Sequence, residues 1–238
     1  MVDSDAPAPP SALGTVARDD PRVSSTPQPV LEVDALSRAY GDHVVLDAIS
    51  FTVRAGSITA LAGPNGSGKS TLLRCIVGAD QADSGTAKLL GQPIDERSLH
   101  SRSHLAVVLD DLDFFPDLSV VEHLDLFAKA FAVPDAEELV DDVLNEVGLI
   151  DQSGQLPGTL SSGQRRRLAL AGALVRPFKL LILDEPEQRL DADGLVWLAG
   201  RLRQARKDGA AVLMATHAPV LIDELPDDVV TLGADQPE

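Results

Sequence analysis

The chain contains 238 residues, of which 44% are hydrophobic and 3% are aromatic, and its formal net charge is -17. This length suits one large α/β domain, or a core that carries an inserted subdomain. The acidic balance argues against nucleic acid as a partner, because phosphate backbones select for Lys and Arg. A single cysteine, Cys75, excludes an internal disulfide framework and fits a reducing compartment. We interpret Cys75 as a small buried residue rather than a redox group.

The sequence contains no recognisable secretory signal or membrane-spanning segment. No run of about eighteen apolar residues occurs, and the first residues lack the basic start and apolar stretch of a secretory signal. We therefore expect a cytoplasmic protein, which would act at a membrane only through a partner that supplies the spanning helices. Residues 1–29 are rich in Pro, Ala, Ser and Asp and predict a disordered tail, so the folded domain is expected over 30–238.

Short apolar segments begin at Val30. Their alternation predicts a small antiparallel sheet with strands over 30–33, 35–40, 44–46 and 49–53. A further apolar segment, 57–62, reads as a buried parallel strand, and 71–77 reads as a helix ended by Gly78.

Between that strand and that helix lies a phosphate-loop pattern, G-x-x-x-x-G-K-[ST], formed by Gly63, Pro64, Asn65, Gly66, Ser67, Gly68, Lys69, Ser70 and Thr71. Glycines let the backbone N–H groups point at an anion, and the helix N-terminus adds positive potential. Lys69 is expected to reach the β- and γ-phosphates of a nucleotide, and Ser70 to hold Mg²⁺. The alternative is a glycine-rich turn with a solvated lysine. Tyr40, the only tyrosine, precedes the loop and either stacks on adenine or is a half-buried residue of the sheet.

The middle of the chain predicts helices. After a buried strand at 105–109, Ser119 and Glu122 have the spacing of a capping box, and two apolar helical stripes follow, broken by Pro134 and ended by Gly148. We interpret about 112–160 as a mostly helical insert. Its crowded carboxylates are most simply a solvated face.

The last third again alternates strands and helices. A helix opens at 160–164, an apolar strand at 180–183 runs into Asp184 and Glu185, an amphipathic helix covers 195–206, and a strand at 210–216 runs into His217. Alternation of this kind predicts a parallel sheet with helices on both faces. Ligands of such sheets lie at the carboxyl ends of the strands, so we expect Lys69, Glu185 and His217 to converge there.

The joint pattern resembles the ATP-binding cassette ATPases, the nucleotide-binding subunits of ABC transporters, over Val30 to about Gly233. Residues 63–71 match the Walker A motif, 160–164 the LSGGQ signature with Ser162 in place of the first glycine, and 180–186 the Walker B motif. The D-loop end matches at 190–191, the switch histidine at His217, and the adenine-stacking aromatic at Tyr40. The resemblance implies an α/β fold: a P-loop NTPase (RecA-like) parallel-sheet core with a small antiparallel β subdomain and an inserted helical subdomain.

The resemblance also implies roles. Asp184 holds Mg²⁺ through water, Glu185 orients or deprotonates the attacking water, and His217 contacts the γ-phosphate. The signature residues Ser161, Gly163 and Gln164 would bind the ATP of an opposite subunit, so the working form would be a homodimer or a pair of cassette subunits. The structural alternatives are a strand-end turn for 184–185, a surface or capping residue for His217, and a helix cap for 161–162.

Two positions depart from the family. Asp110 stands where the Q-loop glutamine is expected; a carboxylate still ligates Mg²⁺, but it adds negative charge near the triphosphate, so we expect altered Mg²⁺ use or slower hydrolysis. The D-loop carries Gln188 and Arg189 before Leu190, and Arg189 either reaches across a dimer or is solvated.

The leading hypothesis from sequence is an ATPase subunit on the cytoplasmic face of a membrane that drives a separate membrane-spanning permease. The coupling groove is expected near Asp110 to Pro116, where Phe114 and Phe115 either contact the partner or are buried in the insert. The competing hypotheses are a soluble cassette protein outside transport and a low-turnover, ATP-binding regulatory module.

Overall fold

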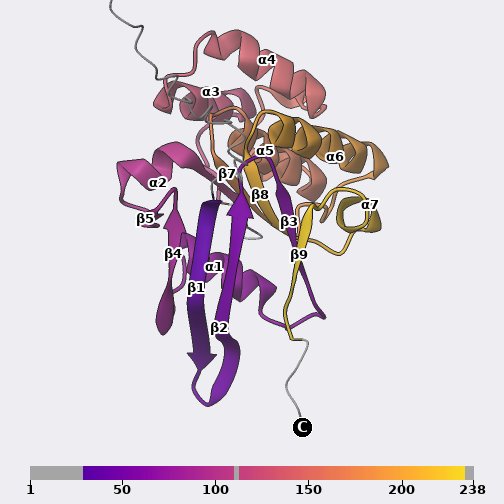
Figure 1. The fold of residues 1–238 in the computed structure, drawn as a ribbon. Coiled ribbons are helices and arrows are strands. Elements are labelled where there is room, and N and C mark those ends of the chain that lie inside the picture. Colours follow the sequence, from indigo (N-terminus) through magenta and orange to yellow (C-terminus); the bar gives the residue numbers. More distant parts are fainter. Residues whose placement is uncertain (1–28, 110–112, 234–238) are drawn as a thin grey trace, which may run out of the picture.

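The computed structural model describes residues 29–109 and 113–233. The predicted tail, apart from Pro29, and the Q-loop residue Asp110 lie outside these ranges. Two separate sheets and two groups of helices make up the described part (Figure 1).

The smaller sheet is antiparallel, as predicted, and has the order β2-β1-β4-β5. It comprises β1 (Pro29–Tyr40), β2 (His43–Arg54), β4 (Ser84–Leu89) and β5 (Gln92–Pro93). The predicted turn at Gly41 and Asp42 is confirmed, because β1 ends at Tyr40 and β2 begins at His43. The breaks predicted at 34 and 47–48 are wrong, because β1 and β2 are long strands with irregular pairing. Ala35 and Ala48 have φ values of 46° and 48° there. The N–H of Ala35 donates to Ser50 Oγ at 2.8 Å and the N–H of Ala48 donates to Ser37 Oγ at 2.9 Å, so side chains keep the chain paired where the ladder is interrupted.

The larger sheet is parallel and has the order β6-β7-β8-β3-β9. Its strands are β3 (Ile58–Ala62), β6 (Leu105–Val108), β7 (Leu180–Asp184), β8 (Ala211–Ala215) and β9 (Asp228–Thr231). The sequence predicted all of these except β9. This edge strand pairs only with β3 and stays mostly exposed, so it lacks the apolar run that marks the buried strands.

Helices cover both faces of the parallel sheet, as predicted. Leu180 and Ile182 of β7 pack in one cluster with α1 (Lys69–Val77). The alternate residues Leu181 and Leu183 pack in a second cluster with α5 (Ser162–Leu174) and α6 (Ala192–Lys207). The period of two along a strand therefore divides the core into two layers. Two shorter helices, α2 (Leu99–His104) and α7 (Pro219–Ile222), were not predicted.

A third cluster lies between α3 (Val120–Ala130), α4 (Ala136–Glu146) and one face of α5. The capping box of Ser119 and Glu122 begins α3 as predicted. Two short 3-10 turns, η1 (Ile150–Gln152) and η2 (Pro157–Thr159), lead from α4 to α5. Because α5 contributes Leu168 to this cluster and Leu170 to the sheet cluster, it joins the helical segment to the sheet. Within the described ranges, no helix has the combination of length and apolar character needed to cross a membrane.

Candidate functional site

The carboxyl ends of three neighbouring strands meet at one edge of the parallel sheet. Leu61 of β3 pairs with Ala215 of β8, and Ala215 pairs with Asp184 of β7. The loop after β3 carries Lys69, Glu185 follows β7, and His217 follows β8. The structure therefore brings together, at one sheet edge, the three groups for which the sequence predicted convergence.

The phosphate loop closes tightly around its own lysine. Lys69 is 6% exposed, and its Nζ donates to the carbonyl oxygens of Gly63 at 2.8 Å and Pro64 at 3.0 Å. Gly68, the N-cap of α1, has φ of 93°, and a Cβ there would lie 2.9 Å from Val45 of β2. Both the backbone conformation and the close approach of β2 require glycine at this position.

The residues of this loop fit a nucleotide phosphate group. A cavity of about 330 Å³ is lined by Val45 of β2, by Glu185, and by loop residues Asn65, Gly66, Gly68, Lys69, Ser70 and Thr71. Ser67 Oγ is buried in the loop without a hydrogen-bond partner in the structure. A buried cation and an unmatched hydroxyl beside a helix N-terminus are suited to an anion.

The described residues do not form a complete magnesium site by themselves. No cluster of three or more His, Cys, Asp or Glu residues that could hold a metal ion occurs in the described part of the chain. Ser70 lines the cavity and Asp184, 3% exposed, ends the neighbouring strand. Mg²⁺ commonly takes one or two protein ligands and completes its shell with phosphate oxygens and water, so this sparse set is compatible with a metal that arrives with a nucleotide.

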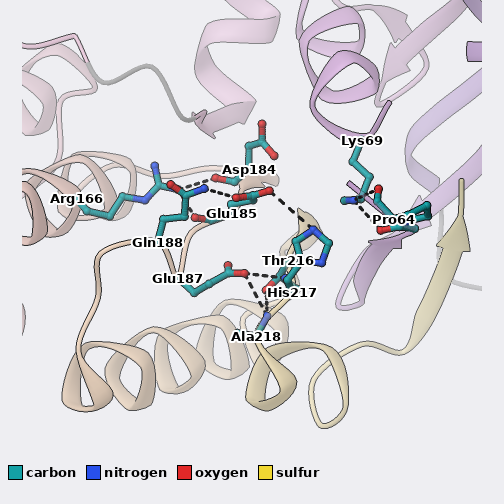
Figure 2. A network of polar contacts seen from close by, with 11 residues as sticks. Pro64, Lys69, Arg166, Asp184, Glu185, Glu187, Gln188, Thr216, His217 and Ala218 are labelled. Atoms are coloured by element: carbon teal, nitrogen blue, oxygen red, sulfur yellow. Dashed lines mark hydrogen bonds and ion pairs between the residues drawn. The ribbon is translucent and has the colours of Figure 1, made fainter. Parts of the chain in front are cut away.

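Glu185 and His217 face each other beside the loop (Figure 2). His217 Nε2 lies 3.9 Å from Glu185 Oε1, and the side-chain amide of Gln188 donates to the other carboxylate oxygen of Glu185. Glu185 has φ of 43°, a left-handed conformation that is strained for a residue with a side chain. Its N–H donates to Ala215 O at 2.8 Å, which ties it to β8. The arrangement places a carboxylate in the lining of the phosphate-loop cavity.

Arg166 supports this strained turn, and sequence reasoning did not single it out. Its side chain is 0% exposed, and its guanidinium donates to the carbonyl oxygens of Asp184 at 2.5 Å, Glu185 at 2.7 Å and Leu109 at 3.1 Å. A signal was present, because Arg166 lies four residues before the buried Leu170 and thus on the inner face of α5. An arginine in that position predicts a buried cation that requires several acceptors.

The signature turn lies at the start of α5, away from the loop cavity. Ser161 is exposed and forms a capping box with Gln164: Ser161 Oγ accepts from the Gln164 N–H at 3.2 Å, and the Ser161 N–H donates to Gln164 Oε1 at 2.8 Å. A Cβ on Gly163 would lie 2.7 Å from the carbonyl oxygen of Arg189, so the signature turn packs directly on the D-loop. Ser161 therefore has the helix-cap geometry named as its structural alternative, while it remains open to a second molecule.

Tyr40 is held by neighbours other than the phosphate loop. Its hydroxyl donates to Asp80, and the guanidinium of Arg38 lies over its ring, 4.6 Å from the centroid. The Tyr40 hydrogen bond, aided by the charge of Arg38 and opposed by desolvation, lowers the pKa of the Asp80 carboxyl. Tyr40 is 49% exposed and does not line the loop cavity described above.

Two adjoining cavities lie between the sheet and the helical segment. They measure about 180 and 350 Å³, and both are lined by Val107, Phe127 and Arg176. Arg176 donates to the carbonyl oxygens of Arg102 and Leu105 and lies over the ring of Phe131, and burial lowers its pKa to about 10. Phe114 lines the smaller cavity, against His123, whereas Phe115 is 54% exposed.

Comparisons of sequence and of structure with known proteins agree with each other. Residues 46–188 match the family model described as ABC transporter. The chain is 33% identical over 205 residues to the SkfA peptide export ATP-binding protein SkfE of Bacillus subtilis (strain 168), covering 85% of each. It is 38% identical over 216 residues to the Nod factor export ATP-binding protein I of Ralstonia nicotianae, covering 86% of this chain but 65% of that protein. A solved structure described as the ATP binding subunit of an ABC transporter superposes with a TM-score of 0.79 at 29% identity, covering 85% of each chain.

Proposed function

The chain belongs to the ABC transporter family as an ATP-binding, ATP-hydrolysing subunit, and we propose that it powers export through a separate membrane-spanning permease, working as a pair of cassettes with ATP between them. The observation that carries this proposal is the single cavity in which Glu185 faces the phosphate loop. The relatives' names describe export, which favours transport over a soluble cassette protein or a low-turnover regulatory module.

Each of the site residues is assigned a separate role in phosphoryl transfer. Lys69 and the loop N–H groups bind the phosphates. Ser70 and Asp184 would hold Mg²⁺, which would supply positive charge to the phosphate oxygens. Glu185 accepts the proton of the attacking water, and His217 orients the γ-phosphate beside it. Tyr40 stacks on adenine with the ring face that Arg38 leaves open. Asp110 would complete the metal site, although it lies outside the described residues.

Pairing of two copies supplies the second half of the site. Ser161 is exposed at a helix N-terminus, and Gly163 presents backbone without a side chain, so this turn offers N–H and hydroxyl donors to the phosphate of another subunit. Within one chain the same turn takes no part in lining the loop cavity. A second copy, or a related cassette, would bring the two together.

The permease is proposed to dock in the two cavities beside Arg176. Their lining combines apolar side chains with the half-buried guanidinium of Arg176, and Phe115 is exposed near the groove predicted from sequence. Docking there would place the protein on the cytoplasmic face of the membrane. Co-purification with a polytopic membrane protein tests this part of the proposal.

ATP hydrolysis by Glu185→Gln tests the catalytic assignment. The amide keeps the size of the side chain but cannot take a proton, so kcat should fall by about 100-fold or more. ATP should still bind within about threefold of the wild-type Kd, and the variant should form an ATP-dependent dimer in sedimentation. Glu224→Gln, at an exposed glutamate paired with Arg203, is the matched control and should leave kcat unchanged. A wild-type rate in Glu185→Gln would overturn the assignment.

A further inference from the structure

The turn between β7 and α6, Pro186 to Leu190, contacts both Glu185 and His217. It is compact, because the N–H of Gln188 donates to Glu185 O and the N–H of Leu190 donates to Glu187 O, each at 3.0 Å. Gln188 holds the carboxylate of Glu185, as described above. The neighbouring residue, Glu187, has no role in the function proposed so far.

Glu187 reaches from this turn to the segment after β8. Its Oε1 accepts from the backbone N–H of His217 at 2.7 Å and from that of Ala218 at 3.2 Å (Figure 2). These two N–H groups lead into α7, whose cap makes no side-chain hydrogen bond of its own. The Ala218 N–H also donates to Thr216 Oγ1 at 3.1 Å, whereas that of His217 donates to Glu187. Glu187 therefore holds the backbone from which the His217 imidazole extends.

The burial of the other carboxylate oxygen of Glu187 costs folding free energy. Oε2 is buried and has no hydrogen-bond partner in the structure. Enclosing a carboxylate oxygen without a donor costs free energy, which a turn selected for stability alone would avoid. The contact from Glu187 instead positions His217, whose Nε2 lies 3.9 Å from Glu185 Oε1.

We propose that Glu187 is a positioning residue for ATP hydrolysis, which acts by holding the His217 backbone so that the imidazole stays beside Glu185 and the γ-phosphate. The proposal rests on the roles given above to Glu185 and His217. Glu187 and Gln188 then form a pair: successive residues of one turn fix the histidine and the carboxylate relative to each other.

Glu187→Ala removes the acceptor and should reduce kcat by about 10-fold to 100-fold, because small displacements of a catalytic group have effects of that size. The Kd for ATP should change by less than about twofold, since the phosphate loop is untouched. Glu187→Gln keeps a carbonyl oxygen for both N–H groups, so its kcat should exceed that of Glu187→Ala. Glu224→Ala is the matched control at an exposed glutamate and should retain wild-type kcat.

A double-mutant cycle separates positioning from general support of the fold. If Glu187 acts through His217, Glu187→Ala should change kcat by less than about twofold in a His217→Ala background. Effects that multiply, or a wild-type kcat in Glu187→Ala, would overturn the inference. Where His217→Ala is too slow to measure, the imidazole ¹⁵N signals of His217 provide the readout: they should shift in Glu187→Ala and not in Glu224→Ala, and unshifted signals would equally overturn it.

The two proposals fail in different ways. A fully active Glu185→Gln would remove the catalytic assignment itself. An inactive Glu185→Gln beside a fully active Glu187→Ala would leave that assignment intact and remove only the positioning role.

Discussion

Arg166 shows how one side chain can determine the geometry of a site that it does not enter. Its guanidinium is enclosed and donates to the carbonyl oxygens of the peptides on both sides of the left-handed Glu185 and to that of Leu109, just after β6. Carbonyl groups that would otherwise be buried without donors are satisfied by a rigid, planar fork. The strained conformation of Glu185 is stable because a neighbouring helix compensates it.

Replacing Arg166 with Met should therefore destabilise the protein strongly. Several buried carbonyl groups would lose a charged donor, so the free energy of unfolding should fall by about 3 kcal/mol or more. Urea denaturation measures the change. Arg203→Met, at an exposed ion pair with Glu224, is the control and should change stability by less than about 1 kcal/mol. Equal losses in the two variants would contradict a supporting role for Arg166.

Individual site residues differed in how far the sequence predicted them. The positions of Lys69 and Ser70 in the loop cavity could be predicted, because the loop motif is contiguous and its geometry is local. The contacts of Arg166 and Glu187 could not, because their acceptors and donors lie 18 to 57 and 30 to 31 residues away in the chain, respectively. For Tyr40, the sequence pattern gave no information about Asp80 and Arg38, which occupy its hydroxyl and one face of its ring.

At the scale of elements, an ion pair joins the signature helix to the helix after the D-loop. Arg167 of α5 donates to Asp191 Oδ1 at 2.5 Å, and the same oxygen accepts from the Gly194 N–H as the N-cap of α6. The Gly194 N–H, followed by Arg167, lowers the pKa of the Asp191 carboxyl. One carboxylate thus begins α6 and holds α5 beside it.

Asp191→Asn should reveal this link through its pH dependence. A carboxylate with a lowered pKa in the folded state contributes stability above its unfolded pKa of about 4, and loses it as pH falls through the lower folded value. Wild type should be more stable than Asp191→Asn at pH 7, and the difference should shrink progressively below about pH 4. Denaturant titrations at a series of pH values provide the measurement. A difference that is constant with pH would show that the charge of Asp191 has no part in the link.

Elements with a clear hydrophobic pattern were predicted from the sequence, whereas elements that depend on tertiary contacts were not. The buried strands and the capped helix α3 have clear patterns, and the structure contains them. The sequence pattern divided β1 at residue 34 and β2 at 47–48. No local pattern indicates that Ser50 Oγ and Ser37 Oγ accept from the N–H groups of Ala35 and Ala48 and keep the two strands paired. β9 and α7 are four residues each, too short for a period to be recognised.

At the scale of the molecule, charge opposes the proposed pairing of two copies. Each chain has a formal net charge of -17, so two identical copies repel each other before any contact forms. Bound ATP adds further negative charge at the interface. Screening by salt is expected to decide how readily the pair assembles.

The ATP-dependent dimer of Glu185→Gln should accordingly become tighter as salt is added. The screening length falls from about 30 Å at 0.01 M to about 8 Å at 0.15 M ionic strength, so long-range repulsion should largely disappear over that range. Sedimentation equilibrium at the two salt concentrations, with ATP held saturating, measures the dimer Kd. A dimer that weakens with added salt would indicate an interface governed by attraction between opposite charges.

The irregular residues Ala35 and Ala48 of the β1–β2 ribbon have a mechanical consequence. Ser50 Oγ accepts from the Ala35 N–H, and Ser37 Oγ accepts from the Ala48 N–H. A side chain of each strand thus binds the backbone of the other, and these two contacts prevent a shift in register. A slip of one residue would turn Val45 away from Gly68, which it contacts, and open one wall of the nucleotide cavity. The antiparallel ribbon thus forms a rigid wall of the nucleotide cavity.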